Sequence, residues 1–481
     1  MTKTINILFL AAEAEPFIKV GGLADVAGTL PLVLRNLPAA TAEEARFDVR
    51  LALPLHRTIR TEPVTLRSVA DFPVYRRGGS IIAQVFQGSL SGMPVYFVNG
   101  DPISEAKAIY SEDPALDREK YGFFSMACLE MTRYLDWEPD ILHANDWHTA
   151  LALYALYSRR KNPAFARIRT MLTLHNLPYM GGEGEDVLAA YDLEAIKDEA
   201  VPAWARSQPL VLGLYGADAI VPVSPTYARE ILTPENGCGL EEYLRSRAGS
   251  VTGILNGLDL TSWDPSADKS LAAMFSVDDL SGRNVNKQAL QKQLELPAEP
   301  RVPILAMLGR IDPQKGVDIT LAALPLIADQ PWQFVLLGTG NAALEEAARS
   351  LQTVFPDRIR AVTRYDPTLG RLIYGGADML LMPSRYEPCG LAQMIAMRFG
   401  CVPVVRTTGG LKDTVQEGKT GFLFTKPTPE ALAEALTRAL AVYASATKWK
   451  RFQRNDMKED FSWVRSARQY AVLYRSLLSR S

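Results

Sequence analysis

The chain has 481 residues, a formal net charge of −2 and 22% charged side chains. This length is typical of two or three domains, and the near-neutral charge argues against general binding to nucleic acid or membrane surfaces. No apolar run reaches the roughly 18 residues of a membrane span, so we expect no membrane partner. No Cys-x-x-Cys pair occurs, which argues against a structural zinc or a disulfide framework and indicates a reducing compartment. The four cysteines, Cys128, Cys238, Cys389 and Cys401, are scattered along the chain. We therefore expect a cytoplasmic protein, or a protein of the plastid stroma if it comes from a plant or alga, although no transit peptide is seen.

Strands alternate with helices in the first half of the chain. Several of these strands are continuously apolar, as in a parallel sheet that is covered on both faces. Helices are expected between them, for example over 120–135 and 148–159. The predicted strands are 5–11, 48–53, 94–98, 140–143, 169–174 and 219–223.

A second series of the same kind follows the turn-rich stretch 249–270, which we interpret as a domain boundary. Near its end, residues 428–445 predict a helix with Thr428 as N-cap and Pro429 at the first helical position. The whole pattern predicts an α/β fold made of two doubly wound, Rossmann-like domains in tandem. The strands of the second series are 303–309, 333–338, 358–363, 379–384 and 402–406.

The stretch "IKVGGLADVAG" over 18–28 leaves the first predicted strand and opens a helix. Lys19 beside two glycines fits an ordinary turn with a solvated lysine. It also fits an anion site, in which glycines admit a ligand to the backbone while helix N–H groups and the lysine supply positive charge. The pattern recurs as "GGLKDTV" over 409–415. Unless this similarity is accidental, each domain contributes one such helix start to a shared cleft at the carboxyl ends of the strands.

The second domain supplies charges that could match such a site. Arg310 and Lys315 follow a predicted strand on one loop. Two cations on one loop suit the binding of a diphosphate, but an ordinary solvated surface loop can have the same sequence. Glu387 stands just before a helix that begins near Cys389 and Gly390. It could stabilise the helix start electrostatically or accept hydrogen bonds from sugar hydroxyls. Cys389 has no histidine near it in sequence, which favours packing over a role as nucleophile.

A set of motifs running through the whole chain resembles bacterial glycogen synthases and plant starch synthases. The resemblance implies a GT-B fold with two Rossmann-like domains facing an interdomain cleft, and transfer of glucose from a nucleotide sugar to the non-reducing end of an α-1,4-glucan such as glycogen or a maltooligosaccharide, with retention at the anomeric carbon. ADP-glucose is the donor implied by the lysine-glycine-glycine loop, and neither a metal nor a cofactor is expected. The motifs are "KVGGLADV", "HANDWHTAL", "LHNLPYMG", "VSPTYAREI", "GILNGLD", "GRIDPQKGVD", "PSRYEPCGLAQM", "TTGGLKDTV" and "FSWVRSARQYAVLY".

The same resemblance implies a domain layout. Residues 1–250 would form the acceptor-side domain with the lysine-glycine-glycine loop, and 251–458 the domain that binds the nucleotide sugar. The last segment, 459–481, would cross back as a helix to the first domain.

Site residues are implied in the same way. Glu387 would orient the glucose hydroxyls, Arg310 and Lys315 would stabilise charge on the leaving phosphate, and the backbone carbonyl of His175 would stabilise positive charge at the anomeric carbon. A front-side attack, in which the leaving phosphate takes the acceptor proton, needs no protein nucleophile. The implied donor-binding residues are Lys19, Gly21, Gly22, Asn256, Tyr365, Cys389, Gly390, Leu391, Gly409 and Gly410. Those implied for the sugar and acceptor cleft are Asp25, Asp146 and Asn176, whereas His143 and His148 are interpreted as structural.

Three positions depart from the family pattern: Met180 replaces a glutamine, Gly370 stands where histidine is common, and "LALPLHRTI" over 51–59 replaces a Pro-x-Tyr element. None of them alters the charged residues Lys19, Arg310, Lys315 and Glu387. Two alternatives to an ADP-glucose enzyme stay open. One is the same reaction with UDP-glucose or with both donors, and the other is a catalytically silent glucan-binding factor on this fold.

Overall fold

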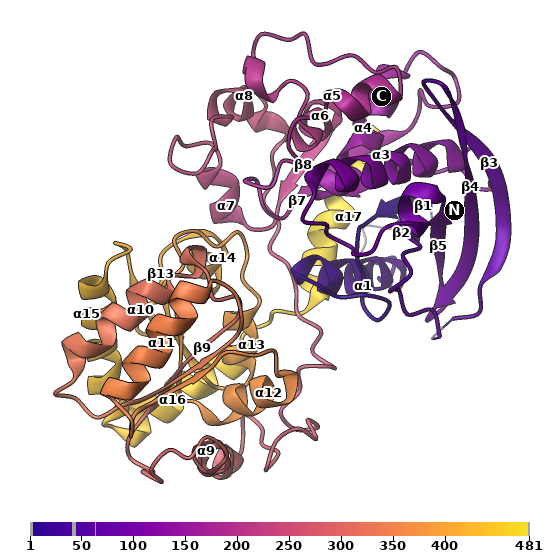
Figure 1. The fold of residues 1–481 in the computed structure, drawn as a ribbon. Helices are drawn as coiled ribbons and strands as arrows, with labels where there is room; N and C mark the ends of the chain where they lie inside the picture. Colours follow the sequence, from indigo (N-terminus) through magenta and orange to yellow (C-terminus); the bar gives the residue numbers. More distant parts are fainter. Residues whose placement is uncertain (1–2, 41–44, 63, 480–481) are drawn as a thin grey trace. The chain divides into compact units, whose positions relative to one another are not determined.

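The computed structural model describes residues 3–40, 45–62 and 64–479, and the chain forms two compact units (Figure 1). Unit 1 comprises Met1–Gly257 together with Trp463–Ser481, and unit 2 comprises Leu258–Ser462. In the part of the chain that is described, no helix is both long and apolar enough to cross a membrane.

Unit 1 is built on an eight-stranded sheet in the order β3-β4-β5-β2-β1-β6-β7-β8. Its central strands are parallel, and β1 pairs with β2 on one side and β6 on the other, so that Ile7 lies opposite both Val49 and Ile141. Strand β6 is buried throughout and β1 is buried over residues 7–10, as predicted, whereas the first half of β2 alternates buried residues with partly or fully exposed ones. The strands are β1 (Lys3–Leu10), β2 (Ala45–Pro54), β3 (Arg67–Arg76), β4 (Gly79–Leu90), β5 (Met93–Asn99), β6 (Ile141–Asn145), β7 (Arg169–Leu174) and β8 (Ala219–Pro222).

The hairpin of β3 and β4 was not predicted from the sequence. It is antiparallel, lies at the edge of the sheet, and alternates buried with exposed positions instead of forming an apolar run. Helix α3 also begins earlier than the predicted 120–135, because Asp113 caps it by accepting a hydrogen bond from the backbone N–H of Ala115. The helices of unit 1 are α1 (Gly22–Arg35), α2 (Asp101–Ser104), α3 (Pro114–Met131), α4 (Asp146–Ser158), α5 (Glu185–Ala190), α6 (Pro209–Gly216), α7 (Pro225–Glu230), α8 (Glu241–Ser246) and α17 (Trp463–Ser479).

Helix α17, yellow in Figure 1, belongs to unit 1 although it ends the chain. It packs against α1 and buries Tyr470 and Tyr474 in the core of unit 1. The Tyr474 hydroxyl lies 2.7 Å from Nδ1 of His143, and Nε2 of His143 lies 2.7 Å from the Thr173 hydroxyl. His143 is therefore a satisfied core histidine, and its predicted structural role is confirmed.

Unit 2 is built on a six-stranded, fully parallel sheet in the order β11-β10-β9-β12-β13-β14. Thr428 caps α15 through its side chain and Pro429 begins the helix, as predicted. Strand β14 has only three residues and was not predicted. The strands are β9 (Ile304–Leu308), β10 (Gln333–Leu337), β11 (Ile359–Val362), β12 (Met379–Met382), β13 (Val402–Arg406) and β14 (Phe422–Phe424). The helices are α9 (Ser281–Gln293), α10 (Val317–Ala323), α11 (Ala342–Val354), α12 (Pro367–Gly376), α13 (Ala392–Arg398), α14 (Gly409–Thr414), α15 (Pro429–Tyr443) and α16 (Ala446–Met457).

Candidate active site

The predicted residues of unit 1 follow neighbouring parallel strands. Lys19 follows β1, Asp146 follows β6 directly, and His175 follows β7 directly. Because β1, β6 and β7 are adjacent and parallel, their carboxyl ends meet at one edge of the sheet. The topology therefore gathers these three side chains at one edge.

Lys19 is held by carboxylates. Its Nζ lies 2.7 Å from Oδ1 of Asp25 and 3.3 Å from Oε2 of Glu15. Burial lowers the pKa of Lys19, but the two carboxylates outweigh it and raise that pKa above its ordinary value. Asp25 lies in the first turn of α1, as predicted, and burial raises its pKa despite the nearby lysine. Lys19 is thus a charged, partly exposed group with a fixed position.

The glycine loop carries a feature that the sequence reasoning missed. Glu13 is buried, and its carboxylate accepts hydrogen bonds from the backbone N–H groups of Val20 at 2.5 Å and Gly21 at 3.0 Å. The N–H of Gly21 is therefore already bound inside the protein, while Gly22 begins α1. Tyr110 also hydrogen-bonds Glu13. Only the acidic run "AEAEP" after the first strand could have hinted at this arrangement.

Asp146 organises the backbone after β7. Its Oδ1 accepts hydrogen bonds from the backbone N–H of His175 at 2.7 Å and of Asn176 at 3.4 Å. Asp146 has a positive φ of 52°, which a short polar side chain tolerates better than most. Burial raises the pKa of Asp146 to about 7, even though the two N–H bonds lower it.

His175 is neutral in the folded protein. Burial lowers its pKa to about 3, and its Nε2 lies 3.0 Å from Oδ1 of Asn145. The amide oxygens of two predicted residues, Asn176 and Asn256, are buried and have no hydrogen-bond partner among the described residues. A buried amide oxygen without a donor costs free energy, so these two oxygens are ready acceptors for a ligand hydroxyl or N–H group.

Unit 2 brings Lys315 and Glu387 into direct contact. Nζ of Lys315 lies 2.9 Å from Oε1 and 2.7 Å from Oε2 of Glu387, and the Ser384 hydroxyl donates to Oε2 at 3.0 Å. Glu387 is only 5% exposed. These residues line a cavity of about 150 Å³ together with Gly309, Gly390 and Leu391, at the carboxyl ends of β9 and β12. Ser384 is a second residue that sequence reasoning missed.

The glycines predicted near Glu387 are required by close backbone approaches. Gly409 has a φ of +44°, and a Cβ there would lie 1.8 Å from the carbonyl oxygen of Glu387. A Cβ at Gly410 would lie 2.0 Å from the carbonyl oxygen of Cys389, and the Gly410 N–H donates to the Glu387 carbonyl at 3.1 Å. Cys389 is buried, in agreement with the packing role predicted for it. The start of α14 therefore locks the backbone that carries Glu387.

Five predicted residues of unit 2 do not line this cavity: Cys389, Gly409 and Gly410, whose contacts are given above, and Arg310 and Tyr365. Arg310 is an exposed residue whose guanidinium lies 2.8 Å from Asp312 and donates to Gln314 at 3.0 Å. Tyr365 is 83% exposed and follows β11, which β10 separates from β9. Both lie at the carboxyl end of the sheet, but neither touches Glu387 in the described structure.

Comparisons with known proteins identify the family of this chain. The family described as starch synthase catalytic domain matches residues 6–246, and glycosyl transferases group 1 matches 287–456. The glycogen synthase of Syntrophotalea carbinolica is 40% identical over 98% of both chains. That of Anaeromyxobacter dehalogenans is 41% identical over 98% of this chain and 99% of its own.

Two solved structures share the fold. The catalytic domain of starch synthase IV from Arabidopsis thaliana, bound to ADP and acarbose, superposes with a TM-score of 0.87 at 32% identity over both complete chains. Sucrose-phosphate synthase from Thermosynechococcus elongatus superposes with a TM-score of 0.62 at 22% identity over both complete chains, which shows the fold alone. The chain has the GT-B fold and belongs to the family of glycogen and starch synthases, glycosyltransferases that build glucans.

Proposed function

We propose that this chain transfers glucose from ADP-glucose to the non-reducing end of an α-1,4-glucan, with retention at the anomeric carbon. The observation that carries this proposal is the Lys315–Glu387 contact inside a small cavity at the carboxyl ends of β9 and β12. A carboxylate can orient sugar hydroxyls and an ammonium group can neutralise a phosphate, so the pair suits a phosphate-linked sugar. Support also comes from the related starch synthase IV catalytic domain, which was solved with ADP and acarbose.

In the proposed reaction, Glu387 accepts hydrogen bonds from the glucose hydroxyls, and Lys315 stabilises the charge that develops on the leaving diphosphate. The acceptor hydroxyl attacks the anomeric carbon from the side of the leaving group. The bond to the phosphate oxygen breaks, and that oxygen takes the acceptor proton. Arg310 would add a second charge for the diphosphate, and unit 2 would hold the nucleotide.

Residues of unit 1 complete the proposal. Lys19 would contribute its charge to the donor by exchanging carboxylate partners for phosphate oxygens. The neutral imidazole of His175 adds no positive charge near the anomeric carbon, and its backbone carbonyl would stabilise the charge that forms there. The hydrogen bonds from the His175 and Asn176 N–H groups to Asp146 fix the local backbone for this role.

Side-by-side donor kinetics test the proposal. Purified enzyme is given glycogen with radiolabelled ADP-glucose or UDP-glucose, and incorporation into polymer is measured. The proposal requires a higher kcat/KM for ADP-glucose and new linkages that β-amylase, which cleaves α-1,4-glucans from the non-reducing end, removes. A higher kcat/KM for UDP-glucose contradicts the donor assignment, and label that β-amylase leaves in place contradicts the linkage or its configuration.

A further inference from the structure

Unit 2 holds a large pocket that the proposed reaction does not use. It measures about 720 Å³, which is within the usual range for a small-molecule site. Its walls come from the beginnings of α9 and α16, from Pro300 and Arg301 ahead of β9, and from Asp378 directly ahead of β12. Lys315 and Glu387 follow the same two strands at their carboxyl ends. The pocket therefore lies at the opposite edge of the sheet from the candidate active site.

Several cationic side chains on the wall of the pocket are not engaged in ion pairs within the described chain. Arg301, Lys450 and Arg454 are exposed on its wall. Among the residues that the structure describes, no carboxylate pairs with any of these three. The Nε of Arg454 donates to the carbonyl of Val277 at 3.4 Å, which leaves its terminal N–H groups for another acceptor.

Three carboxylates also line the pocket, and one of them is paired with a cation. Asp378 accepts from Nζ of Lys287 at 2.8 Å. Asp278 and Asp279 are exposed, and Asp279 accepts from the backbone N–H of Ser281 at 2.9 Å in the first turn of α9. The three available cations thus outnumber the two carboxylates that no cation pairs with in the described chain.

One helix beginning and one buried donor add to the positive potential. Helix α16 has 12 residues, and the side chain of its N-cap residue does not cap it in the described chain, so its N-terminus presents partial positive charge at the pocket. The beginning of α9 adds less, because the Asp279 carboxylate already accepts from its first N–H group. The indole N–H of Trp449, a wall residue, is buried and has no acceptor within the described ranges.

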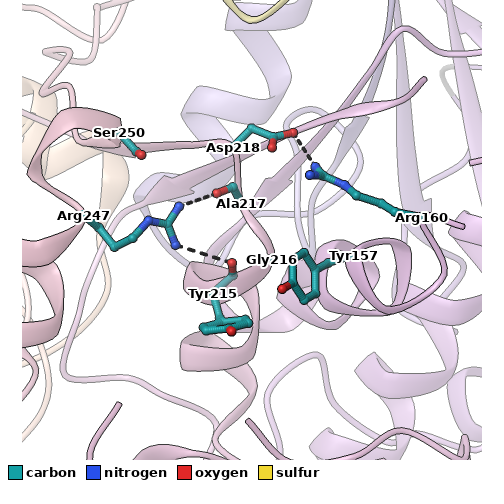
Figure 2. Close-up of a pocket in the computed structure, with 8 residues that line it drawn as sticks. All are labelled: Tyr157, Arg160, Tyr215, Gly216, Ala217, Asp218, Arg247 and Ser250. Carbon is teal, nitrogen blue, oxygen red and sulfur yellow. Dashed lines mark hydrogen bonds and ion pairs between the residues drawn. The ribbon is translucent and has the colours of Figure 1, made fainter. Parts of the chain in front are cut away.

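A pocket in unit 1 shows the contrast. It measures about 380 Å³, and Figure 2 shows two arginines on its wall whose hydrogen bonds go to the protein itself. Arg247 donates to the Ala217 carbonyl at 2.6 Å, and Arg160 pairs with Asp218 at 2.5 Å. Arginines that are already bound in this way offer little to an anion. The same holds for Arg283 in the unit 2 pocket, which donates to the carbonyls of Tyr374, Phe399 and Ala377, whereas Arg301 and Arg454 pair with no carboxylate of the described chain.

We propose that the unit 2 pocket is a second binding site, for a small organic phosphate such as a phosphorylated sugar or a nucleotide. The phosphate would lie between the helix beginnings and the exposed cations, where Arg301 and Arg454 can bind its oxygens in bidentate fashion and Lys450 can act as a point charge. The volume leaves room for the sugar or base beside Tyr443 and Trp449. This site goes beyond the proposed transfer reaction and needs no residue of it.

The test is calorimetric titration of the full chain with three probes: fructose 1,6-bisphosphate, AMP and inorganic phosphate. Arg301→Glu/Lys450→Glu should weaken binding of at least one organic phosphate by about tenfold or more. The matched control Lys292→Glu/Lys448→Glu changes the same number of charges on the exposed surface of α9 and α16 outside the pocket and should bind like wild type.

A second measurement locates the site. Hydrogen exchange with the bound probe should protect amides over 280–284 and 446–450, and Lys315→Gln should keep this protection. The proposal is overturned if none of the probes binds, if the charge-reversed pair binds as tightly as its control, or if protection appears only around Lys315 and Glu387.

Discussion

The contact between Lys315 and Glu387 allows structural and catalytic roles to be separated with three variants: Lys315→Gln, Glu387→Gln and the double substitution. Glu387 is 5% exposed and the Lys315 side chain is 23% exposed. Removing one member of a fully buried pair costs about 3–5 kcal/mol, because the other charge is left without a partner. Since Lys315 is partly exposed, we expect each single variant to lose about 1–3 kcal/mol of unfolding free energy.

The double variant leaves no orphaned charge. The double variant should therefore lose less unfolding free energy than the two single variants lose when their losses are added. We expect this difference, measured in a double-mutant cycle, to be about 1–2 kcal/mol. Catalysis should behave differently. If Glu387 orients the glucose and Lys315 stabilises the leaving phosphate, each single variant loses roughly 10²–10³ in kcat, and the double variant recovers none of it.

Urea denaturation and radiolabelled transfer to glycogen measure the two quantities on the same preparations. Lys419→Gln, which removes a more exposed cation of unit 2 that lies 3.7 Å from Glu459, serves as the control and should change neither. A double variant that regains turnover along with stability would show that the pair is only structural. A Glu387→Gln enzyme that keeps more than about a tenth of wild-type kcat would refute the catalytic role directly.

Three further predictions concern single residues. Lys19→Gln should lower kcat/KM for ADP-glucose about 10- to 150-fold, the equivalent of about 1.5–3 kcal/mol, while the KM for glycogen stays unchanged. Wild-type kinetics in this variant would show that the loop around Lys19 is an ordinary turn and not an anion site. Gly409→Ala forces a Cβ against the Glu387 carbonyl oxygen and should destabilise unit 2 by about 3 kcal/mol or more, whereas Gly418→Ala, with a φ of +72° and open space around it, should cost only about 1–2 kcal/mol in the same denaturation assay. Burial lowers the pKa of His143 to about 3, against 6.5 in the unfolded chain, so the stability that its neutral form contributes is present above pH 6.5 and is lost as the pH falls towards 3. Between pH 7.5 and 5.5 the wild type should therefore lose about 1.4 kcal/mol more unfolding free energy than His143→Gln. Equal losses would contradict a neutral, buried imidazole.

Continuous apolar strands made most of the fold predictable. Most parallel strands of the two sheets are buried on two faces, so their sequences are largely apolar, and the turn-rich stretch between the two series stands out. The hairpin of β3 and β4 was not predicted, because strands at the edge of a sheet need only one buried face and so do not form a continuous apolar run. Its register depends on pairing with β5, a long-range contact that a local pattern does not encode.

Part of the arrangement around the candidate site could be expected from the sequence. Lys315 and Glu387 each follow a predicted strand of the second series, whereas Asp146 was named from the family resemblance, and the functional roles of all three stay predictions. Their partners could not be expected, because a hydrogen bond between segments far apart in the chain leaves no spacing in the sequence. Glu13 is the clearest example, since its bonds to Val20 and Gly21 depend on how the loop after β1 folds back.

These internal partners bear on how an anionic donor can bind. The charges that the proposed function assigns to the diphosphate are already compensated by carboxylates: Lys19 by Asp25 and Glu15, and Lys315 by Glu387. The affinity for the donor therefore depends on how far the new lysine–phosphate interactions exceed the lysine–carboxylate interactions that they replace, so it should be smaller than the number of basic residues suggests. The same exchange favours catalysis. As the bond to the phosphate breaks in the proposed reaction, negative charge on the leaving group grows while that on a carboxylate stays constant, so each lysine would shift towards the phosphate. A lysine balanced between two anions would thus give more to the transition state than to the ground state.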